Sequence, residues 1–271
     1  MKRETWKRLL VGDFSIRRML FSILFIYLCL CLFAYFVADR MIFLPPPASY
    51  RDGGDILKIP VADGIGIAAL HLPHPQARFT ILYSHGNAED LGALSPYLKE
   101  YRSRGFAVFA YDYEGYGTSD GRATEKNTYR DIQAAYHYLR ERPQVPAHRI
   151  LVLGRSVGSG PAVELARREP VAGLVLESPF LSAFRVMTRW PLLPFDEFDN
   201  LAKIRQVKGP LLLVHGRRDR VIPFWHGETL FAHANEPKAA LWIGEADHND
   251  LVEVAGEDYW RALQKWTAAL P

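Results

Sequence analysis

The stretch Ile150–Pro161, ILVLGRSVGSGP, carries the strongest signal in the chain, because four apolar residues run directly into a glycine-rich turn. Residues 154–158 read GRSVG, a G-x-S-x-G string that is short enough to occur by chance. Ser156 is therefore either an exposed nucleophile or a small residue in a packing turn. A strand before the string and a helix after it favour the nucleophile, because a sharp strand-to-helix turn leaves no room for side chains at 154 and 158.

Short apolar runs recur through the chain. Each is too short for a helix and apolar on both faces, as buried parallel strands are. The runs are 79–83, 106–111, 150–153, 171–176, 211–214 and 240–243. Between them lie amphipathic helical stripes, as at 129–139 and 259–270. This alternation predicts an α/β fold with a mostly parallel, doubly wound sheet, and the runs 56–59 and 65–70 are expected to form an antiparallel edge.

Polar residues follow the last two predicted strands. Asp219 lies five residues after one apolar run and His248 five residues after the next. Carboxyl ends of parallel strands meet at one edge of a sheet, and the order serine, acid, histidine is that of the α/β-hydrolase fold. We therefore predict Ser156 as nucleophile, His248 as base and Asp219 as the acid that orients it. The alternatives are a solvated loop role for Asp219, another of the nine histidines as base, and Asp247 as a poorly aimed acid.

An oxyanion site is expected after the run that ends at Tyr83, in LYSHGNAEDLG. Gly86 lets the backbone approach a substrate closely, and the backbone N–H groups of Asn87 and Val157 are predicted to bind the developing negative charge. The alternative is that His85 and Gly86 only shape a turn.

We expect neither a cofactor nor a metal. His71 and His74 stand in a proline-flanked loop without a nearby acidic ligand, and no nucleotide motif competes with the serine string. Residues 178–200 are rich in aromatic and aliphatic side chains, which is typical either of a lid over an acyl or lipid-like substrate or of ordinary packing.

The N-terminus is predicted to anchor the protein in a membrane. Residues 19–38 form an uncharged run of 20 residues, about the length that a helix needs to cross a bilayer. Residues 1–18 hold six basic and two acidic residues, so the positive-inside rule predicts a cytoplasmic tail and a periplasmic or otherwise extracytoplasmic domain. A cleaved signal peptide is the alternative, but Phe36 occupies the position where cleavage requires a small residue.

The remaining composition limits the partners. Residues 19–271 carry 27 basic and 28 acidic residues, which argues against nucleic-acid binding. Cys29 and Cys31 both lie in the apolar run, so the rest of the chain has no thiol for a disulfide or a zinc site. Residues 39–50 read as a stiff proline-rich connector, and residues 51–271 as the α/β-hydrolase domain.

These motifs resemble the membrane-attached α/β-hydrolases that include palmitoyl-protein thioesterases and their bacterial relatives. The resemblance covers nearly everything beyond the anchor and rests on YSHGNAEDLG, YDYEGYGTSDG, GRSVGSGP, FDEFDNLAKI, HGRRDRVIP and HNDL. It implies hydrolysis of an ester or thioester, with the triad at Ser156, Asp219 and His248. This chain departs from the eukaryotic thioesterases, whose N-terminus is a lipidated cysteine-rich segment, in having a predicted spanning helix.

The predicted activity is hydrolysis of carboxylic ester or thioester bonds through a covalent acyl-enzyme, without a cofactor. One alternative is a serine aminopeptidase-like amide hydrolase, which uses the same triad on the same fold. The other is a non-catalytic, membrane-tethered binding module on a hydrolase scaffold.

Overall fold

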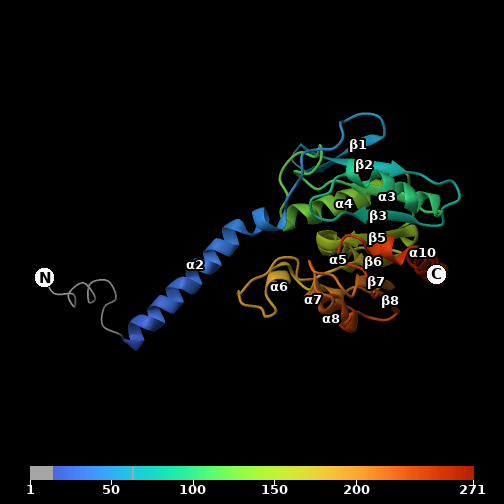
Figure 1. The fold of residues 1–271 in the computed structure, drawn as a ribbon. Helices are drawn as coiled ribbons and strands as arrows, with labels where there is room; N and C mark the ends of the chain where they lie inside the picture. The colour runs from blue at the N-terminus through green and yellow to red at the C-terminus, as the bar shows by residue number, and fades with distance from the viewer. Residues whose placement is uncertain (1–14, 63) are drawn as a thin grey trace. The chain divides into compact units, whose positions relative to one another are not determined.

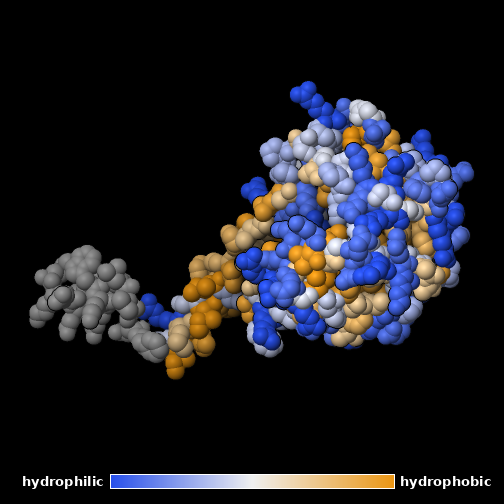
Figure 2. All heavy atoms as spheres, turned by 45° about the vertical axis from the view of Figure 1, so that its right-hand side comes forward, coloured by the Kyte–Doolittle hydropathy of each residue, from blue (hydrophilic) through white to orange (hydrophobic). Residues whose placement is uncertain are grey.

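The computed structural model describes residues 15–62 and 64–271. Most of the predicted basic tail therefore lies outside the described residues. The chain divides into two compact units between Met41 and Ile42. The first contains α2 (Ile16–Ile42) up to Met41, a helix that is long and apolar enough to cross a membrane by length and composition (Figure 1). Most of its apolar side chains are exposed (Figure 2).

Across the described residues, eight strands form one sheet in the order β1-β2-β4-β3-β5-β6-β7-β8. Their bounds are β1 Ile56–Ala62, β2 Ile65–Leu72, β3 Thr80–Ser84, β4 Ala107–Tyr111, β5 Ile150–Arg155, β6 Gly173–Glu177, β7 Leu211–Gly216 and β8 Lys238–Ile243. Neighbouring strands from β4 to β8 are parallel, whereas β1 and β2 pair antiparallel and β2 joins β4 antiparallel. The predicted mostly parallel sheet with an antiparallel edge is confirmed.

Helices cover both faces of this sheet (Figure 1). The longer ones are α3 (Leu91–Ser103), α4 (Glu125–Glu141), α5 (Ser159–Arg168), α8 (Trp225–His233) and α10 (Glu257–Ala268). One buried cluster joins the sheet to α4, α5 and α8, and the other joins it to α3 and α10. Within β3, Leu82 belongs to the first cluster while Ile81 and Tyr83 belong to the second, because successive strand side chains point to opposite faces.

The segment expected to be a free connector packs instead on the second unit. Phe43 is 5 % exposed, with its ring 5.9 Å from that of Phe198. The Ser49 N–H donates to Asp90 Oδ2 at 2.6 Å. The ring of Phe43 and the carboxylate of Asp90 thus fix this segment to the second unit, although its proline content had suggested a free spacer. The compact unit accordingly begins at Ile42, ahead of the expected start at residue 51.

The predicted lid region contains α6 (Ala183–Met187) and the start of α7 (Asn200–Ile204). Its tip exposes apolar side chains, with Met187 at 84 % and Trp190 at 69 %. Its end is anchored, because Phe198 is fully buried. One end of the segment therefore packs against the body, while the other presents apolar surface to solvent, and the lid stays a prediction.

Candidate active site

The nucleophile candidate lies at a strained turn between β5 and α5. Ser156 has φ +53°, a conformation that costs a non-glycine residue energy and that persists at functional sites when the surroundings enforce it. A Cβ on Gly154 would lie 2.4 Å from the Gly158 carbonyl oxygen, and a Cβ on Gly158 would lie 2.2 Å from the Ser84 carbonyl oxygen. The predicted need for glycine at both positions is confirmed, because backbone atoms fill the space that a side chain would take.

The three predicted triad side chains meet at the carboxyl edge of the sheet. His248 Nε2 lies 2.9 Å from Ser156 Oγ, and His248 Nδ1 lies 2.8 Å from Asp219 Oδ2. Each residue follows a different strand, namely β5, β7 and β8. His248 and Asp219 are 7 % and 6 % exposed, so their contact is largely shielded from water. The imidazole therefore bridges the hydroxyl and the carboxylate, with one ring nitrogen facing each.

Asp219 is held in its ionised form. Burial by itself would raise the pKa of this carboxyl, but hydrogen bonds from His215 and His248 outweigh burial and lower the pKa well below its usual range. The Ile222 backbone N–H adds a hydrogen bond of 2.7 Å to Oδ1. At neutral pH the carboxylate thus favours a proton on His248 Nδ1, which leaves Nε2 free to accept one from the serine.

The sequence analysis assigned no role to His215. This fully buried side chain places Nε2 3.3 Å from Asp219 Oδ2 and 2.9 Å from the Ile222 carbonyl oxygen. An N–H at that nitrogen can donate to both acceptors, so His215 contacts the same carboxylate oxygen as His248 does. Its position at the end of a predicted strand, four residues before Asp219, was the available signal.

Asp247, the alternative acid, does not contact the imidazole. Its Oδ1 accepts the backbone N–H groups of Arg220 at 2.9 Å and of His248 at 2.8 Å. Its own N–H donates to Asp250 Oδ1 at 2.7 Å. Asp247 therefore shapes the loop that carries the histidine, as adjacency in sequence predicted.

The predicted oxyanion loop packs directly on the elbow, because Gly158 approaches the carbonyl oxygens of both Ser84 and His85. The side chain of Asn87 is fixed, since its Oδ1 accepts the Leu44 N–H at 2.9 Å and the Tyr116 hydroxyl at 2.6 Å. Within the described part of the chain, the backbone N–H of Asn87 has no acceptor. A substrate oxygen can take that place.

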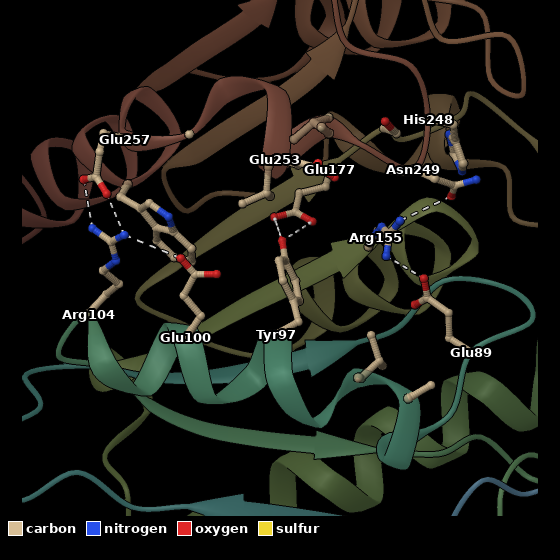
Figure 3. A pocket seen from close by; sticks show the side chains of 17 residues that line it. Glu89, Tyr97, Glu100, Arg104, Arg155, Glu177, His248, Asn249, Glu253 and Glu257 are labelled. Atoms are coloured by element: carbon tan, nitrogen blue, oxygen red, sulfur yellow. Dashed lines mark hydrogen bonds and ion pairs between the residues drawn. The ribbon is translucent and has the colours of Figure 1, made fainter.

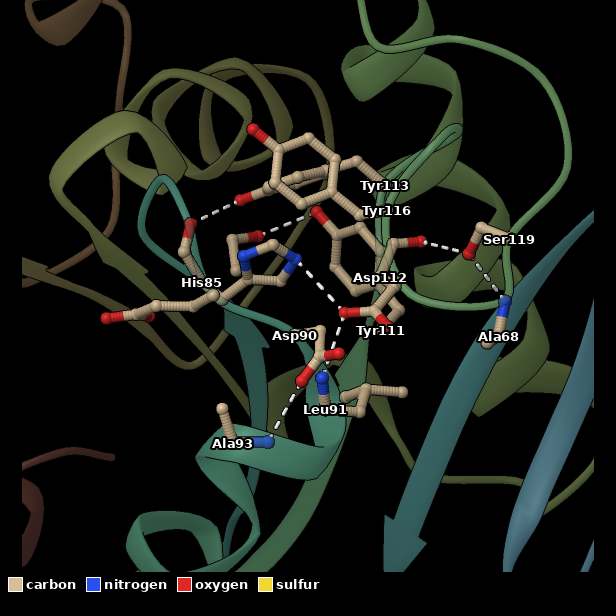
Figure 4. A network of polar contacts seen from close by, with 12 residues as sticks. Ala68, His85, Asp90, Leu91, Ala93, Tyr111, Asp112, Tyr113, Tyr116 and Ser119 are labelled. Carbon is tan, nitrogen blue, oxygen red and sulfur yellow. Dashed lines mark hydrogen bonds and ion pairs between the residues drawn. The ribbon is translucent and has the colours of Figure 1, made fainter. Parts of the chain in front are cut away.

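A buried polar network supports this loop from below (Figure 4). Asp112 Oδ1 lies 3.3 Å from His85 Nε2 and accepts the Leu91 N–H at 3.1 Å. The Tyr113 hydroxyl donates to the His85 carbonyl oxygen at 2.6 Å. Burial opposes a charge on His85, but the Asp112 carboxylate prevails and raises the pKa of the imidazole. This buried contact between His85 and Asp112 thus helps to hold the backbone that leads to Asn87.

A second ion pair, which the sequence analysis did not identify, links the loops above the sheet. Arg155 Nη1 lies 2.5 Å from Glu89 Oε1, and Nη2 donates to Asn249 Oδ1 at 3.3 Å. Glu89 Oε2 accepts the Gly86 N–H at 3.2 Å. One arginine therefore joins the elbow to the loop before Asn87 and to the loop of His248. Its place within GRSVG was the only signal in the sequence.

Comparison with known proteins identifies the family. A family profile described as "Serine aminopeptidase, S33" matches residues 75–198. Alpha/beta hydrolase domain-containing protein 17B from Homo sapiens is 42 % identical over 193 residues, which cover 70 % of this chain and 67 % of that protein. The chain belongs to the α/β-hydrolase domain-containing protein 17 family. Protein aho-3 of Caenorhabditis elegans, another α/β-hydrolase domain-containing protein, is 42 % identical over 188 residues, covering 66 % of this chain and 55 % of that protein.

Solved structures agree on the fold. The Pyrococcus furiosus esterase Pf2001 superposes with a TM-score of 0.70 at 19 % identity, covering 84 % of this chain and 97 % of the esterase. A monoacylglycerol lipase from Paleococcus ferrophilus gives a TM-score of 0.60 at 21 % identity, covering 75 % and 98 %. The chain has the α/β-hydrolase fold and is a hydrolase of that family.

Proposed function

We propose that this protein is a serine hydrolase that cleaves carboxylic ester or thioester bonds of acyl substrates. The observation that carries the proposal is the imidazole of His248 bridging Ser156 Oγ at 2.9 Å and Asp219 Oδ2 at 2.8 Å. The strained backbone of Ser156 and the loop carrying Asn87 beside it support the same assignment.

In the proposed reaction, Ser156 Oγ attacks the acyl carbonyl carbon while His248 Nε2 takes the hydroxyl proton. The carbonyl oxygen becomes negative and is bound by the backbone N–H groups of Asn87 and Val157. His248 then returns the proton to the leaving alcohol or thiol as its bond to the carbonyl carbon breaks. Water, deprotonated by the same imidazole, hydrolyses the acyl-enzyme, and Asp219 stabilises the imidazolium in both halves. No cofactor takes part in this scheme.

Amide hydrolysis is a second candidate, favoured by the match of residues 75–198 to a family described as a serine aminopeptidase. The same nucleophile serves both reactions, so the leaving group decides between them. Rates on acyl esters, acyl thioesters and aminoacyl amides, measured side by side on one preparation, distinguish the candidates. We expect the oxygen or sulfur esters to turn over faster.

We also propose that α2 is an uncleaved membrane anchor, with the basic N-terminus in the cytoplasm and the catalytic domain on the other side. The length and apolar surface of α2, together with the excess of basic residues in 1–18, support this orientation. Protease treatment of intact cells is expected to degrade the domain. Protection that persists until the cells are broken would reverse the orientation.

The catalytic proposal is tested with Ser156→Ala in the full chain, purified in detergent. We expect loss of labelling by a fluorophosphonate probe and a fall of roughly 10⁴- to 10⁶-fold in p-nitrophenyl butyrate turnover. Ser103→Ala, which alters an exposed serine at the end of α3, is the matched control and should behave as wild type. Turnover that survives Ser156→Ala would exclude this serine as the nucleophile and with it the proposed mechanism.

A further inference from the structure

A groove of about 680 Å³ leads away from His248 (Figure 3). One wall is formed by Ala93 and Tyr97 of α3 and by Arg104, which directly follows this helix. These positions span about 16 Å of helix at 1.5 Å per residue. The other wall is α9 (Leu251–Ala255) with the start of α10, and the end of β6 forms the floor. The groove is thus long enough for an extended group that begins at the imidazole.

The groove lies on the side of the leaving group. His248 lines it, and His248 is the residue that would hand a proton to the departing alcohol or thiol. An acyl chain is a poor occupant of the groove. It would cover the carboxyl groups with hydrocarbon and would not replace the hydrogen bonds that they make to water. The polar half of the substrate therefore fits this groove better than the acyl half.

Negative charge prevails along the groove, which is lined by five glutamates and two arginines. Both arginines are engaged by lining glutamates, since Arg104 Nη2 lies 2.7 Å from Glu257 Oε1 and Arg155 bonds Glu89. In Figure 3, Glu177 and Glu253 lie between these two ion pairs. No salt bridge is found for either carboxyl within the described residues. Glu253 therefore presents an exposed carboxyl with no guanidinium in contact, whereas the charged form of the buried Glu177 is favoured at longer range by Arg155.

Glu177 is a buried acceptor. It is 2 % exposed, and the Tyr101 hydroxyl donates to its Oε1 at 2.9 Å, with Tyr259 as a second close donor. Burial raises the pKa of this carboxyl, because no water solvates the charged form. A cation placed beside it would supply the missing stabilisation and keep it ionised.

Ser178 gives an independent indication of a ligand. This groove-lining residue is 1 % exposed, and within the described chain its Oγ has no hydrogen-bond partner. Its φ is +44°, which is a strained value for a serine. A buried hydroxyl without a partner loses the hydrogen bonds that it would make in water, so native structures rarely leave one unused. A polar group in the groove would complete its hydrogen bonding.

We propose that this groove binds the leaving group of the substrate, that this leaving group carries an ammonium or guanidinium cation held between Glu177 and Glu253, and that the Ser178 hydroxyl bonds a polar atom of the same group. The inference rests on the proposed esterase function, since it concerns the alcohol or thiol that His248 protonates. It adds a substrate class, namely acyl esters of cationic alcohols or thiols.

The test compares three esters with the same acyl group on the full chain in detergent, with acid release followed by pH-stat titration. Butyrylcholine is cationic, 3,3-dimethylbutyl butyrate is its neutral isostere, and 1-butyrylglycerol carries hydroxyl groups instead of charge. We expect kcat/KM for butyrylcholine to exceed that for the isostere roughly tenfold. This value lies between the small contribution of an exposed ion pair and the larger contribution of a buried one. The preference should weaken as salt is raised.

Glu253→Gln should move the ratio of kcat/KM for butyrylcholine to that for the isostere toward one. Ser178→Ala should instead lower kcat/KM for both esters in parallel, because the oxygen that its hydroxyl would bond is present in both leaving groups. Glu253 is exposed, so its replacement is compatible with folding. Glu141→Gln removes the same charge at the exposed end of α4, outside the groove lining, and should keep the wild-type ratio. A wild-type ratio near one, a ratio that Glu253→Gln leaves unchanged, rates that Ser178→Ala leaves unchanged, or faster turnover of 1-butyrylglycerol would overturn the inference. Failure of the esterase proposal is separately visible as absent turnover of p-nitrophenyl butyrate.

Discussion

Arg155 and Glu89 form an ion pair across the active-site edge, with Nη1 2.5 Å from Oε1 and with both side chains mostly buried. Through the Gly86 N–H on one side and Asn249 on the other, the pair connects the loop before Asn87 with the loop of His248. One guanidinium thus links the proposed oxyanion donor and the proposed base to the turn that carries Ser156.

Replacing this arginine should therefore impair the chemical step. For Arg155→Gln we expect kcat for p-nitrophenyl butyrate to fall about 10- to 100-fold with KM nearly constant, because misplaced donors weaken transition-state stabilisation more than ground-state binding. Arg142→Gln, at an exposed position after α4, is the matched control. Wild-type kcat in Arg155→Gln would show that the ion pair has no positioning role.

Tyr116, in the loop after β4, restrains Asn87 through its hydroxyl. Tyr116→Phe removes the hydroxyl that donates to Asn87 Oδ1 at 2.6 Å but keeps the buried ring. We expect kcat to fall about threefold to tenfold as the Asn87 backbone loses part of its restraint. Tyr138→Phe is the control, because its ring stacks on Phe109 and no hydrogen bond of its hydroxyl is found within the described chain. Equal rates in the two variants would show that the Tyr116–Asn87 hydrogen bond does not affect catalysis.

The identity of the acid can be tested with two neighbouring aspartates of the site. Asp219→Asn should lower kcat about 10⁴-fold, since the neutral amide no longer fixes the imidazole tautomer or stabilises its cation. Asp247→Asn should cost far less, because Asp247 bonds backbone N–H groups rather than the ring. Rates are measured on p-nitrophenyl butyrate, and a reversed order of the two variants would assign the acid to Asp247.

The elbow glycines should tolerate no side chain. Gly158→Ala would place a Cβ 2.2 Å from the Ser84 carbonyl oxygen, and backbone atoms cannot rotate away, so the free energy of unfolding should fall by about 2 kcal/mol or more. Gly244→Ala is the control, since nothing lies within 4 Å of its Cβ position. Urea midpoints of the full chain in detergent provide the comparison. Equal midpoints would contradict the packing described for the elbow.

Asp131 should make stability depend on pH. Burial, together with the nearby Glu114 carboxylate, raises the pKa of Asp131 to about 8, and one of its oxygens has no hydrogen-bond partner within the described chain. The unfolded chain releases this proton near pH 3.9, so the folded state binds more protons between the two values. Stability from this group is thus present at low pH and is lost as pH rises from about 4 to 8.

Asp131→Asn keeps the size and shape of the side chain and removes its titratable carboxyl group. We expect the thermal midpoint to change less between pH 5 and pH 8 in this variant than in the wild type. Asp55→Asn, at an exposed position, should reproduce the wild-type slope. An unchanged slope in Asp131→Asn would mean that the carboxyl does not titrate between pH 5 and pH 8.

Much of the fold could be predicted from the sequence, because the signals are local. Apolar runs separated by amphipathic stripes indicate parallel strands and covering helices, and GRSVG between a strand and a helix indicates the elbow. Asp219 and His248 could be proposed because a parallel sheet brings the residues that follow its strands to one edge. The order of strands and helices along the chain is therefore enough to predict the sheet, the elbow and the edge at which Asp219 and His248 lie.

Tertiary structure decided the contacts between side chains distant in sequence. Proline content gave no sign that Phe43 packs on Phe198, since burial depends on what the rest of the chain leaves uncovered. The Arg155–Glu89 pair and the unpartnered hydroxyl of Ser178 likewise depend on how loops from different strands approach one another. Such contacts have no periodicity along the chain, because their geometry is fixed only once the sheet has formed and its loops have met.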